Sequence, residues 1–186
     1  SEEEILSEID KINQDSLIHG VIVQLPLPEH ISVAKVLNRI NPSKDVDGFT
    51  PNNVGKLFLG EDTLVSCTPK GIMQMLRISG TDLNGKNVTV IGRSNIVGKP
   101  VSILCQSQNA TVTMCHSRTQ DLAGEVGQAD VVIAAYSVQG TEEFRARFGL
   151  TGNALQRLTR LKSLVGEWQS EDSNTSFERH LKVGGP

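Results

Sequence analysis

The stretch Val88-Thr-Val-Ile-Gly-Arg-Ser-Asn-Ile-Val-Gly98 decides the fold of this chain. Its β-branched residues predict a strand that ends at Gly92, and a polar turn then leads to Gly98, where an amphipathic run begins. A strand, a tight turn and a helix N-terminus in this order offer backbone N–H groups and a positive dipole end to a phosphate. Glycines also permit close approach of a ligand. Because Ser94 stands at the second glycine of the usual G-x-G-x-x-G fingerprint, an ordinary turn between strand and helix stays open as the alternative.

Strand and helix patterns alternate through the middle of the chain. Strands are predicted at residues 88–91, at residues 111–114 and at Val131–Ala134, with helical patterns between them. Such alternation indicates a parallel, doubly wound sheet. The expected fold class is therefore α/β, with a Rossmann-like domain as the second of two domains.

The N-terminal part reads as short helices around one strand. A capping box formed by Ser1 and Glu4 predicts a helix over residues 2–13. The unbroken apolar run at residues 20–25 predicts a buried strand, which ends at Pro26. The other predicted elements are a helix over residues 33–40 capped by Ser32, a turn-rich loop over residues 41–48, and a helix over residues 68–78 with Thr68 as cap and Pro69 at its first position.

Composition excludes several classes of protein. The 186 residues carry a formal net charge of -3 and show no basic stripe with interleaved aromatics, which argues against nucleic acid as a partner. The apolar runs are too short for a transmembrane helix, and the acidic opening residues do not resemble a signal peptide. The odd cysteine count, without metal-ligand spacing, predicts reduced thiols in a cytoplasmic protein and no metal site. These cysteines are Cys67, Cys105 and Cys115.

Polar residues next to the predicted strand at residues 20–25 are candidates for a binding site. Gln24 lies at the carboxyl end of that strand, the end that faces the ligand crevice in α/β sheets. A buried amide needs a partner, which is either a ligand or the protein itself. Asp45 and Asp47 lie in a loop with Gly48, where they can cap the next segment, chelate a cation or accept N–H groups from a ligand. A metal site needs more ligands than this loop offers.

A second candidate site follows the predicted strand at residues 111–114. His116, Ser117 and Arg118 come directly after it. A basic and hydroxyl pair at this place is typical of recognition of the 2′-phosphate of NADP, whereas NAD favours an acidic residue. A solvated turn without a ligand is the alternative.

Five short motifs occur in one order along the chain. They are Gly20-Val-Ile-Val-Gln-Leu-Pro-Leu-Pro28, Lys44-Asp-Val-Asp-Gly48, Cys67-Thr-Pro-Lys-Gly71, Gly92-Arg-Ser-x-x-Val-Gly98-x-Pro100 and Cys115-His-Ser-Arg-Thr119. Together they resemble the bifunctional methylenetetrahydrofolate dehydrogenase/methenyltetrahydrofolate cyclohydrolase family of the bacterial type. The resemblance covers residues 1–135.

The resemblance implies a role for each matching residue. Gln24 and Asp47 are implied as catalytic residues, in which Gln24 orients the folate or a lysine and Asp47 accepts hydrogen bonds from the pterin edge. The implied contacts to the folate substrate are Val23, Gln24, Leu25, Pro26 and Asp47. The implied contacts to NADP are Gly92, Arg93, Ser94, Val97, Gly98, His116, Ser117 and Arg118.

The resemblance also implies a reaction and a setting. NADP accepts hydride from methylene-tetrahydrofolate, and water then opens the methenyl product to formyl-tetrahydrofolate, within one-carbon metabolism and purine biosynthesis. Family members are expected to be cytoplasmic homodimers. The expected domains are residues 1–66 as part of the folate-binding domain, residues 67–135 as the NAD(P)-binding domain, and residues 136–186 as a tail.

Two departures from the family pattern bear on activity. The family's catalytic lysine and its nearby tyrosine lie in a helix that would precede Ser1, and no Tyr-x-x-x-Lys occurs here. Residues 136–186 lack the family's later strands and its glycine-rich folate loop, so we expect a divergent, loosely packed tail. A shifted reading frame, or a splice or assembly artefact, is the expected origin. The chain is therefore expected to be inactive. A non-catalytic fragment that binds a dinucleotide, or an unrelated dinucleotide-dependent oxidoreductase, are the alternatives.

Overall fold

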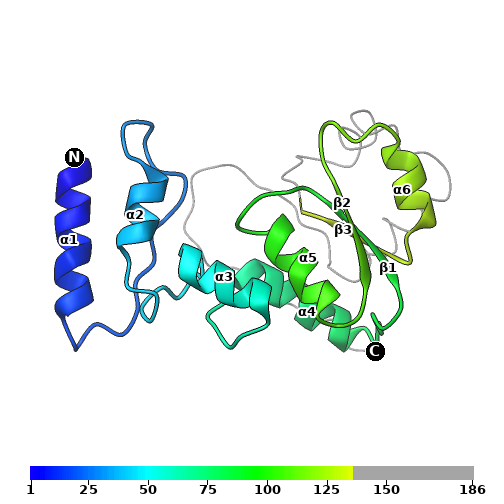
Figure 1. The fold of residues 1–186 in the computed structure, drawn as a ribbon, viewed down its shortest axis with the longest axis horizontal. Helices are drawn as coiled ribbons and strands as arrows, with labels where there is room; N and C mark the ends of the chain where they lie inside the picture. The colour runs from blue at the N-terminus through cyan, green and yellow to red at the C-terminus, as the bar shows by residue number, and fades with distance from the viewer. Residues whose placement is uncertain (136–186) are drawn as a thin grey trace, which may run out of the picture.

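The computed structural model describes residues 1–135, in which six helices and three strands form an elongated arrangement (Figure 1). The predictions made for residues 136–186 lie outside the described residues. The elements in chain order are α1 (Glu2–Gln14), α2 (Val33–Arg39), α3 (Pro51–Leu59), α4 (Cys67–Ile78), β1 (Asn87–Ile91), α5 (Gly98–Gln106), β2 (Thr111–Cys115), α6 (Leu122–Gln128) and β3 (Val131–Ala134).

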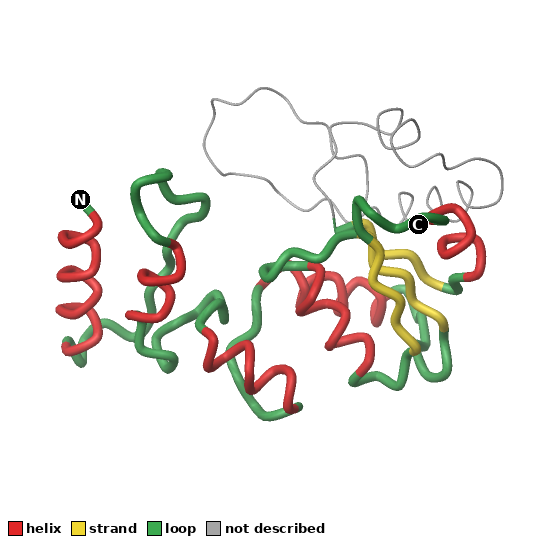
Figure 2. Tube along the Cα trace, turned by 45° about the horizontal axis from the view of Figure 1, so that its top comes forward, coloured by secondary structure: helices red, strands yellow, loops and turns green. Residues whose placement is uncertain are grey.

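The three strands form one parallel sheet in the order β2-β1-β3. Ile91 pairs with Cys115 of β2 and with Ala134 of β3, so the carboxyl ends of all three strands lie level at one edge. Helices α4 and α5 cover one face of the sheet and α6 covers the other (Figures 1 and 2). The α/β class and the three strands predicted from the sequence are confirmed.

Alternation along β1 builds two cores, one on each face of the sheet. Val88 and Val90 pack with residues of α4 and α5, among them Val101. Ile91 points to the opposite face and packs with Val126 of α6. Because successive side chains of a strand point to opposite faces, a run of apolar residues is needed when both faces are covered. The apolar pattern of residues 88–91, interrupted only by the buried Thr89, therefore follows from the central place of β1.

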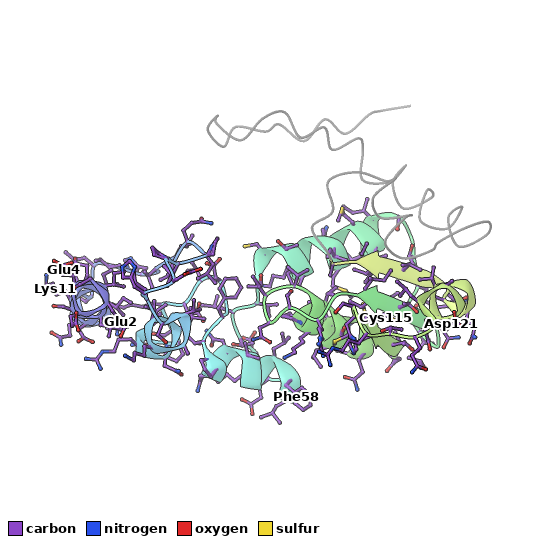
Figure 3. The ribbon with its side chains drawn as sticks, turned by 90° about the horizontal axis from the view of Figure 1, so that it is seen from above. Glu2, Glu4, Lys11, Phe58, Cys115 and Asp121 are labelled. Atoms are coloured by element: carbon purple, nitrogen blue, oxygen red, sulfur yellow. The ribbon has the colours of Figure 1, made fainter. Side chains whose placement is uncertain are left out.

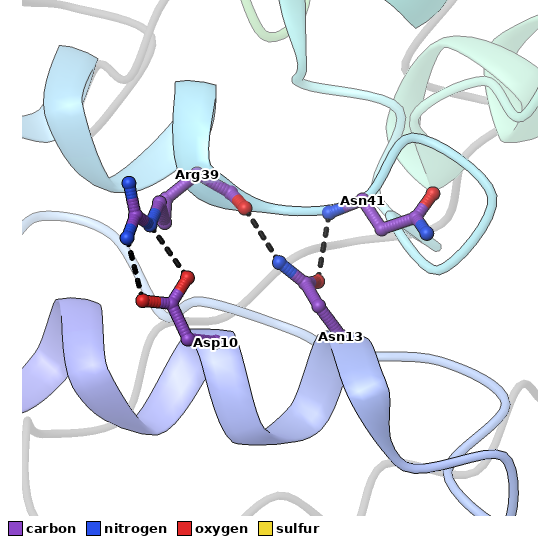
Figure 4. Close-up of polar contacts among 4 residues, drawn as sticks. All are labelled: Asp10, Asn13, Arg39 and Asn41. Carbon is purple, nitrogen blue, oxygen red and sulfur yellow. Dashed lines mark hydrogen bonds and ion pairs between the residues drawn. The ribbon is translucent and has the colours of Figure 1, made fainter.

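Helices α1 and α2 form a separate layer at the other end of the arrangement (Figure 1). Ile9 and Val36 are buried between them. At the edge of this contact, both carboxylate oxygens of Asp10 accept hydrogen bonds from the guanidinium of Arg39, from Nε and Nη2, at 2.6 Å each (Figure 4). The predicted Ser1–Glu4 capping box is present, and Ser32 caps α2 as predicted.

The buried strand predicted at residues 20–25 is wrong. Only Val21 pairs, in a single parallel bridge with Asp45, and Ile22 is 64% exposed. Val21 and Val23 pack against the α1–α2 core, whereas the side chains of Ile22 and Gln24 are exposed. An apolar run forms a buried strand only when strands pair along both of its sides, and among residues 1–135 this segment has one neighbour at one position.

Two helix starts differ from the sequence prediction. Helix α4 begins at Cys67 with Ser66 as its cap residue, so Pro69 occupies the third helical position instead of the first. Helix α3 was not predicted, although Thr50 caps it, Pro51 opens it and Gly60 ends it in the left-handed conformation. Thr-Pro followed by a later glycine is a recognisable helix signature. No helix within residues 1–135 has the length and apolarity to cross a membrane.

Candidate functional site

The turns after β1 and β2 lie side by side at the carboxyl edge of the sheet. The backbone N–H of Gly92 donates to the carbonyl of Cys115 at 2.8 Å, which joins the start of one turn to the end of the other strand. Arg93 and Ser117 each lie two residues beyond a registered strand pair. The structure therefore brings the two groups of predicted dinucleotide contacts, residues 92–98 and 116–118, to one edge.

Ser94 organises the turn after β1. Its Oγ accepts hydrogen bonds from the N–H groups of Val97, at 3.1 Å, and Gly98, at 3.2 Å, and its carbonyl accepts from Lys99 N at 3.0 Å. The first N–H groups of α5, which the sequence predicts to bind phosphate, are thus satisfied within the turn. By contrast, the backbone N–H groups of residues 93–96 make no hydrogen bond with any of residues 1–135. These groups are the donors that the turn presents to an anion.

The two glycines of this turn pack against protein backbone. Gly92 has a φ of 120°, and a Cβ placed on it would lie 2.4 Å from the carbonyl oxygen of Ala135. A Cβ on Gly98 would lie 2.2 Å from the carbonyl oxygen of Gly92. We expected glycine here because it permits close approach of a ligand. In the structure glycine is needed because the protein's own backbone approaches closely: the start of α5 packs on the end of β1, and the residue after β3 packs on Gly92.

The turn after β2 is held by His116 and Thr119. His116 N donates to Thr119 Oγ1 at 2.9 Å, and Thr119 N donates back to the His116 carbonyl at 2.9 Å. The N–H of Arg118 donates to Nδ1 of His116 at 3.2 Å. The imidazole is thereby engaged in the turn itself, while Ser117 and Arg118 are exposed.

Gln24 is exposed, so a buried amide satisfied within the protein, the alternative given above, does not occur. Its Nε2 donates to the carbonyl of Leu25 at 3.1 Å, and the Leu25–Pro26 peptide is cis. The amide oxygen of Gln24 makes no hydrogen bond with the described residues. Val23 and Leu25 are half-buried and Pro26 is exposed.

Asp45 and Asp47 differ in burial and in hydrogen bonding. Asp45 is 2% exposed, and its Oδ2 accepts from Thr50 N at 2.7 Å and from Asn53 Nδ2 at 2.9 Å, so it is the structural acceptor. Asp47 is half-buried and makes no hydrogen bond within residues 1–135. Burial raises the pKa of the Asp47 carboxyl, and the negative charge of Asp45 raises it further.

The predicted folate contacts come from two neighbouring segments. Val21 and Asp45 form a parallel bridge, so residues 22–25 and residues 46–48 leave this pairing point in the same direction. Gln24 and Asp47 are thus three and two residues beyond one pairing point. Sequence reasoning missed Asn53, the buried partner of Asp45, because α3 itself was missed.

The remaining groups of interest are the potential metal ligands and the cysteine thiols. Within residues 1–135 no group of three or more His, Cys, Asp or Glu side chains is placed to hold a metal ion. Burial raises the pKa of the Cys105 thiol to about 11. Burial also raises the pKa of Cys115, and the charge of Glu125 adds to the effect.

Family comparisons agree with both halves of this arrangement. The model of the tetrahydrofolate dehydrogenase/cyclohydrolase catalytic domain matches residues 1–47, and that of the NAD(P)-binding domain of the same enzymes matches residues 66–144. Bifunctional protein FolD of Geotalea daltonii is 60% identical over 135 residues, and that of Bacillus subtilis is 56% identical over 135 residues. Each alignment covers 73% of this chain and 48% of the relative, so the chain spans about half the length of the curated relatives it matches.

Solved structures agree as well. The bifunctional FolD enzyme of Campylobacter jejuni superposes with a TM-score of 0.71 at 46% identity, over 73% of this chain and 48% of that one. The methylenetetrahydrofolate dehydrogenase-cyclohydrolase of Trypanosoma brucei, solved with NADP cofactor and an inhibitor, gives a TM-score of 0.71 at 39% identity, over 75% of this chain and 48% of that one. The chain belongs to the tetrahydrofolate dehydrogenase/cyclohydrolase family.

Proposed function

We propose that this chain carries the NADP site and part of the tetrahydrofolate site of a methylenetetrahydrofolate dehydrogenase/cyclohydrolase. The observation that carries the proposal is the pair of turns at the carboxyl edge of the sheet, joined by the bond from Gly92 N to the carbonyl of Cys115. Ligands of open α/β sheets bind outside the carboxyl ends of the strands. The proposed domains are residues 1–66 for folate and residues 67–135 for the dinucleotide.

The residues of the two turns fit a phosphorylated dinucleotide. The unpaired N–H groups of residues 93–96 suit a pyrophosphate, and the close packing of Gly92 against Ala135 keeps the turn tight enough to converge them. Arg93 and Arg118 are exposed cations at the same edge. Together with Ser117, they are proposed to bind the 2′-phosphate by charge-assisted hydrogen bonds and so to favour NADP over NAD. Val97, Gly98, Ser94 and His116 shape the two turns around it.

The folate site is proposed along residues 23–26 and at Asp47. NADP, when bound, supplies the hydride acceptor for the methylene carbon of the substrate. Gln24 has a free amide oxygen, so it can orient an N–H or ammonium group. Asp47 has both carboxylate oxygens free to accept from the pterin edge. Val23, Leu25 and Pro26 supply apolar surface beside them.

One structural observation favours a narrower function, dinucleotide binding without turnover. The sheet of the dinucleotide half has both faces covered, whereas the segment carrying Gln24 is paired at one bridge only. Such a chain would bind NADP and leave methylene-tetrahydrofolate unchanged. The reduced cysteines are consistent with a cytoplasmic setting, and the homodimer implied by the resemblance is open to sedimentation analysis.

Calorimetric titration of NADP and NAD into the full chain tests the proposal. We expect NADP to bind more tightly, and we expect the preference to disappear in Arg93→Ala combined with Arg118→Ala. Equal affinity of the unmodified chain for both nucleotides would contradict the assignment. An assay of NADPH formation from methylene-tetrahydrofolate then separates turnover, on the order of 1–1000 per second for a typical enzyme, from binding alone.

A further inference from the structure

The buried side chain of Asn53 joins three parts of the chain around the loop that carries Asp47. It is 4% exposed, and its Nδ2 donates to the carbonyl of Pro42 at 2.9 Å and to Oδ2 of Asp45 at 2.9 Å. Its Oδ1 accepts from Thr63 Oγ1 at 3.0 Å. Both ends of the amide are therefore engaged, and α3 is fastened to the chain on either side of it.

The loop itself is fixed on both sides of Asp47. On one side, Asp45 is anchored by Thr50 N and by the Asn53 amide. On the other side, Gly48 has a φ of 67°, and a Cβ placed there would lie 2.4 Å from the carbonyl oxygen of Leu64. Leu64 directly follows Thr63, the third partner of Asn53. Residues 63–64 therefore pack against Gly48 in the Asp47 loop and also hydrogen-bond to the side chain of Asn53, which anchors that loop.

We infer that Asn53 is a positioning residue for Asp47, which fixes the carboxyl of Asp47 at the proposed tetrahydrofolate site by donating a hydrogen bond to Asp45 and so anchoring the loop. The inference rests on the proposed function for its ligand, but its geometry stands by itself. A buried carboxylate that loses a donor must regain it from water. Removal of the Asn53 amide should therefore open the loop and let Asp47 turn into solvent.

This opening has a measurable signature at Asp47. Its pKa is raised by burial and by the nearby charge of Asp45. An opened loop weakens both effects, so the pKa of Asp47 should fall toward its ordinary value. A residue that contributed only to the general stability of α3 would leave this titration unchanged in the folded protein.

The experiment compares Asn53→Ala with Asn52→Ala in the full chain. Asn52 is the adjacent, exposed asparagine of the same helix, which makes it a matched control. Carboxyl NMR titration measures the pKa of Asp47, and titration with tetrahydrofolate measures binding. For Asn53→Ala we expect a lowered Asp47 pKa and a loss of affinity for tetrahydrofolate of about tenfold, the ratio that one buried hydrogen bond represents, with NADP binding unchanged. Identical behaviour of the two variants would overturn the inference.

Unfolding and failure of the ligand assignment are detected separately. The pKa of Asp10 is held low by its hydrogen bonds to Arg39 between α1 and α2, so its return to an ordinary value marks loss of the fold there. If Asn53→Ala unfolds by this criterion, Thr63→Val replaces it, because it removes only one donor to Asn53. Thr63→Val should also lower the pKa of Asp47, and an unchanged Asp47 pKa would overturn the inference. If the unmodified chain binds no tetrahydrofolate, the proposed function fails, while the titration of Asp47 still decides the role of Asn53.

Discussion

Gly98 packs directly against the backbone of Gly92, with no room for a side chain between them. A Cβ on Gly98 would lie 2.2 Å from the Gly92 carbonyl oxygen. This contact brings the first residue of α5 onto the end of β1. It closes the turn that we propose to hold NADP, because Ser94 can reach Gly98 N only when the helix starts this close to the strand.

Replacement of Gly98 by alanine should therefore destabilise the dinucleotide half. The methyl group has to displace backbone, and we expect a loss of about 1–3 kcal/mol in the free energy of unfolding, typical of overpacking in a tight site. Urea denaturation followed by circular dichroism measures it. Gly71→Ala is the control, because Gly71 lies in α4 with nothing within 4 Å of its Cβ position. That substitution should stabilise the protein by about 0.5–1 kcal/mol. A Gly98→Ala protein as stable as Gly71→Ala would contradict the contact.

The hydroxyl of Ser94 should behave as a helix cap although it lies outside α5. Ser94→Ala removes the acceptor of two backbone N–H groups, and lost caps typically cost about 0.5–2 kcal/mol. Ser94→Thr keeps the hydroxyl and should retain most of the stability. Thermal unfolding of the three proteins provides the comparison. If alanine and threonine at this position gave equal unfolding temperatures, the capping role would be rejected.

The Asp10–Arg39 pair should make stability depend on acidity. Hydrogen bonds from Arg39 lower the pKa of Asp10 below 3.8, its ordinary value. Above that value both folded and unfolded states are ionised, and the stabilisation is complete. As the pH falls from about 3.8 through the lower folded pKa, the unfolded state takes up the proton first, and the stabilisation is lost.

Urea denaturation at a series of pH values measures this dependence. Asp10→Asn should flatten the loss of stability in acid relative to the unmodified chain. Asp62→Asn, at an exposed aspartate without an ion pair among the described residues, should leave it unchanged. An acid profile of Asp10→Asn that follows the unmodified chain would show that the pair does not act in solution.

Lys44 should hold the carboxyl end of α1 from outside the helix. Its Nζ donates to the carbonyls of Ile12 at 2.6 Å, Asn13 at 3.1 Å and Asp15 at 2.7 Å. A cation at this end also interacts favourably with the helix dipole. Lys44→Met should therefore speed amide hydrogen exchange in the last turn of α1. Lys70→Met, at an exposed position of α4, should leave that exchange unaltered, and equal protection in both variants would argue against the role.

The parts of the fold that the sequence predicted correctly are those whose burial is decided locally. The central strand β1 is covered on both faces, so its largely apolar run and the βα turn after it suffice to place it. The segment at residues 20–25 has the same kind of run, but its structure depends on strands paired beside it, which a local pattern does not report. The prediction failed there for that reason.

At the candidate site, the structure adds hydrogen-bonding detail that the sequence does not predict. The sequence predicts Ser94 and Gly98 in one turn, and the structure shows that Ser94 accepts from the N–H groups of Val97 and Gly98, whereas the N–H groups of residues 93–96 make no hydrogen bond among the described residues. The residue pattern by itself does not distinguish Asp45 from Asp47, although the family resemblance implies Asp47, and the structure shows that Asp45 is the more deeply buried of the two. Asn53 acts over eight residues through side-chain hydrogen bonds, and no spacing rule predicts such a contact.

The three cysteines can be used to measure local unfolding of the two hydrophobic clusters on either face of the sheet. Cys105 is buried with α4 and α5 on one face of the sheet, Cys115 is buried with α6 on the other (Figure 3), and Cys67 is exposed. A thiol-modifying reagent therefore labels Cys67 directly, and reaches the other two only after local unfolding. The rates at Cys105 and Cys115 would differ if the α6 layer detaches before the α4–α5 layer. Mass spectrometry of partly labelled protein would thus measure the opening free energies of the two faces separately, without any substitution.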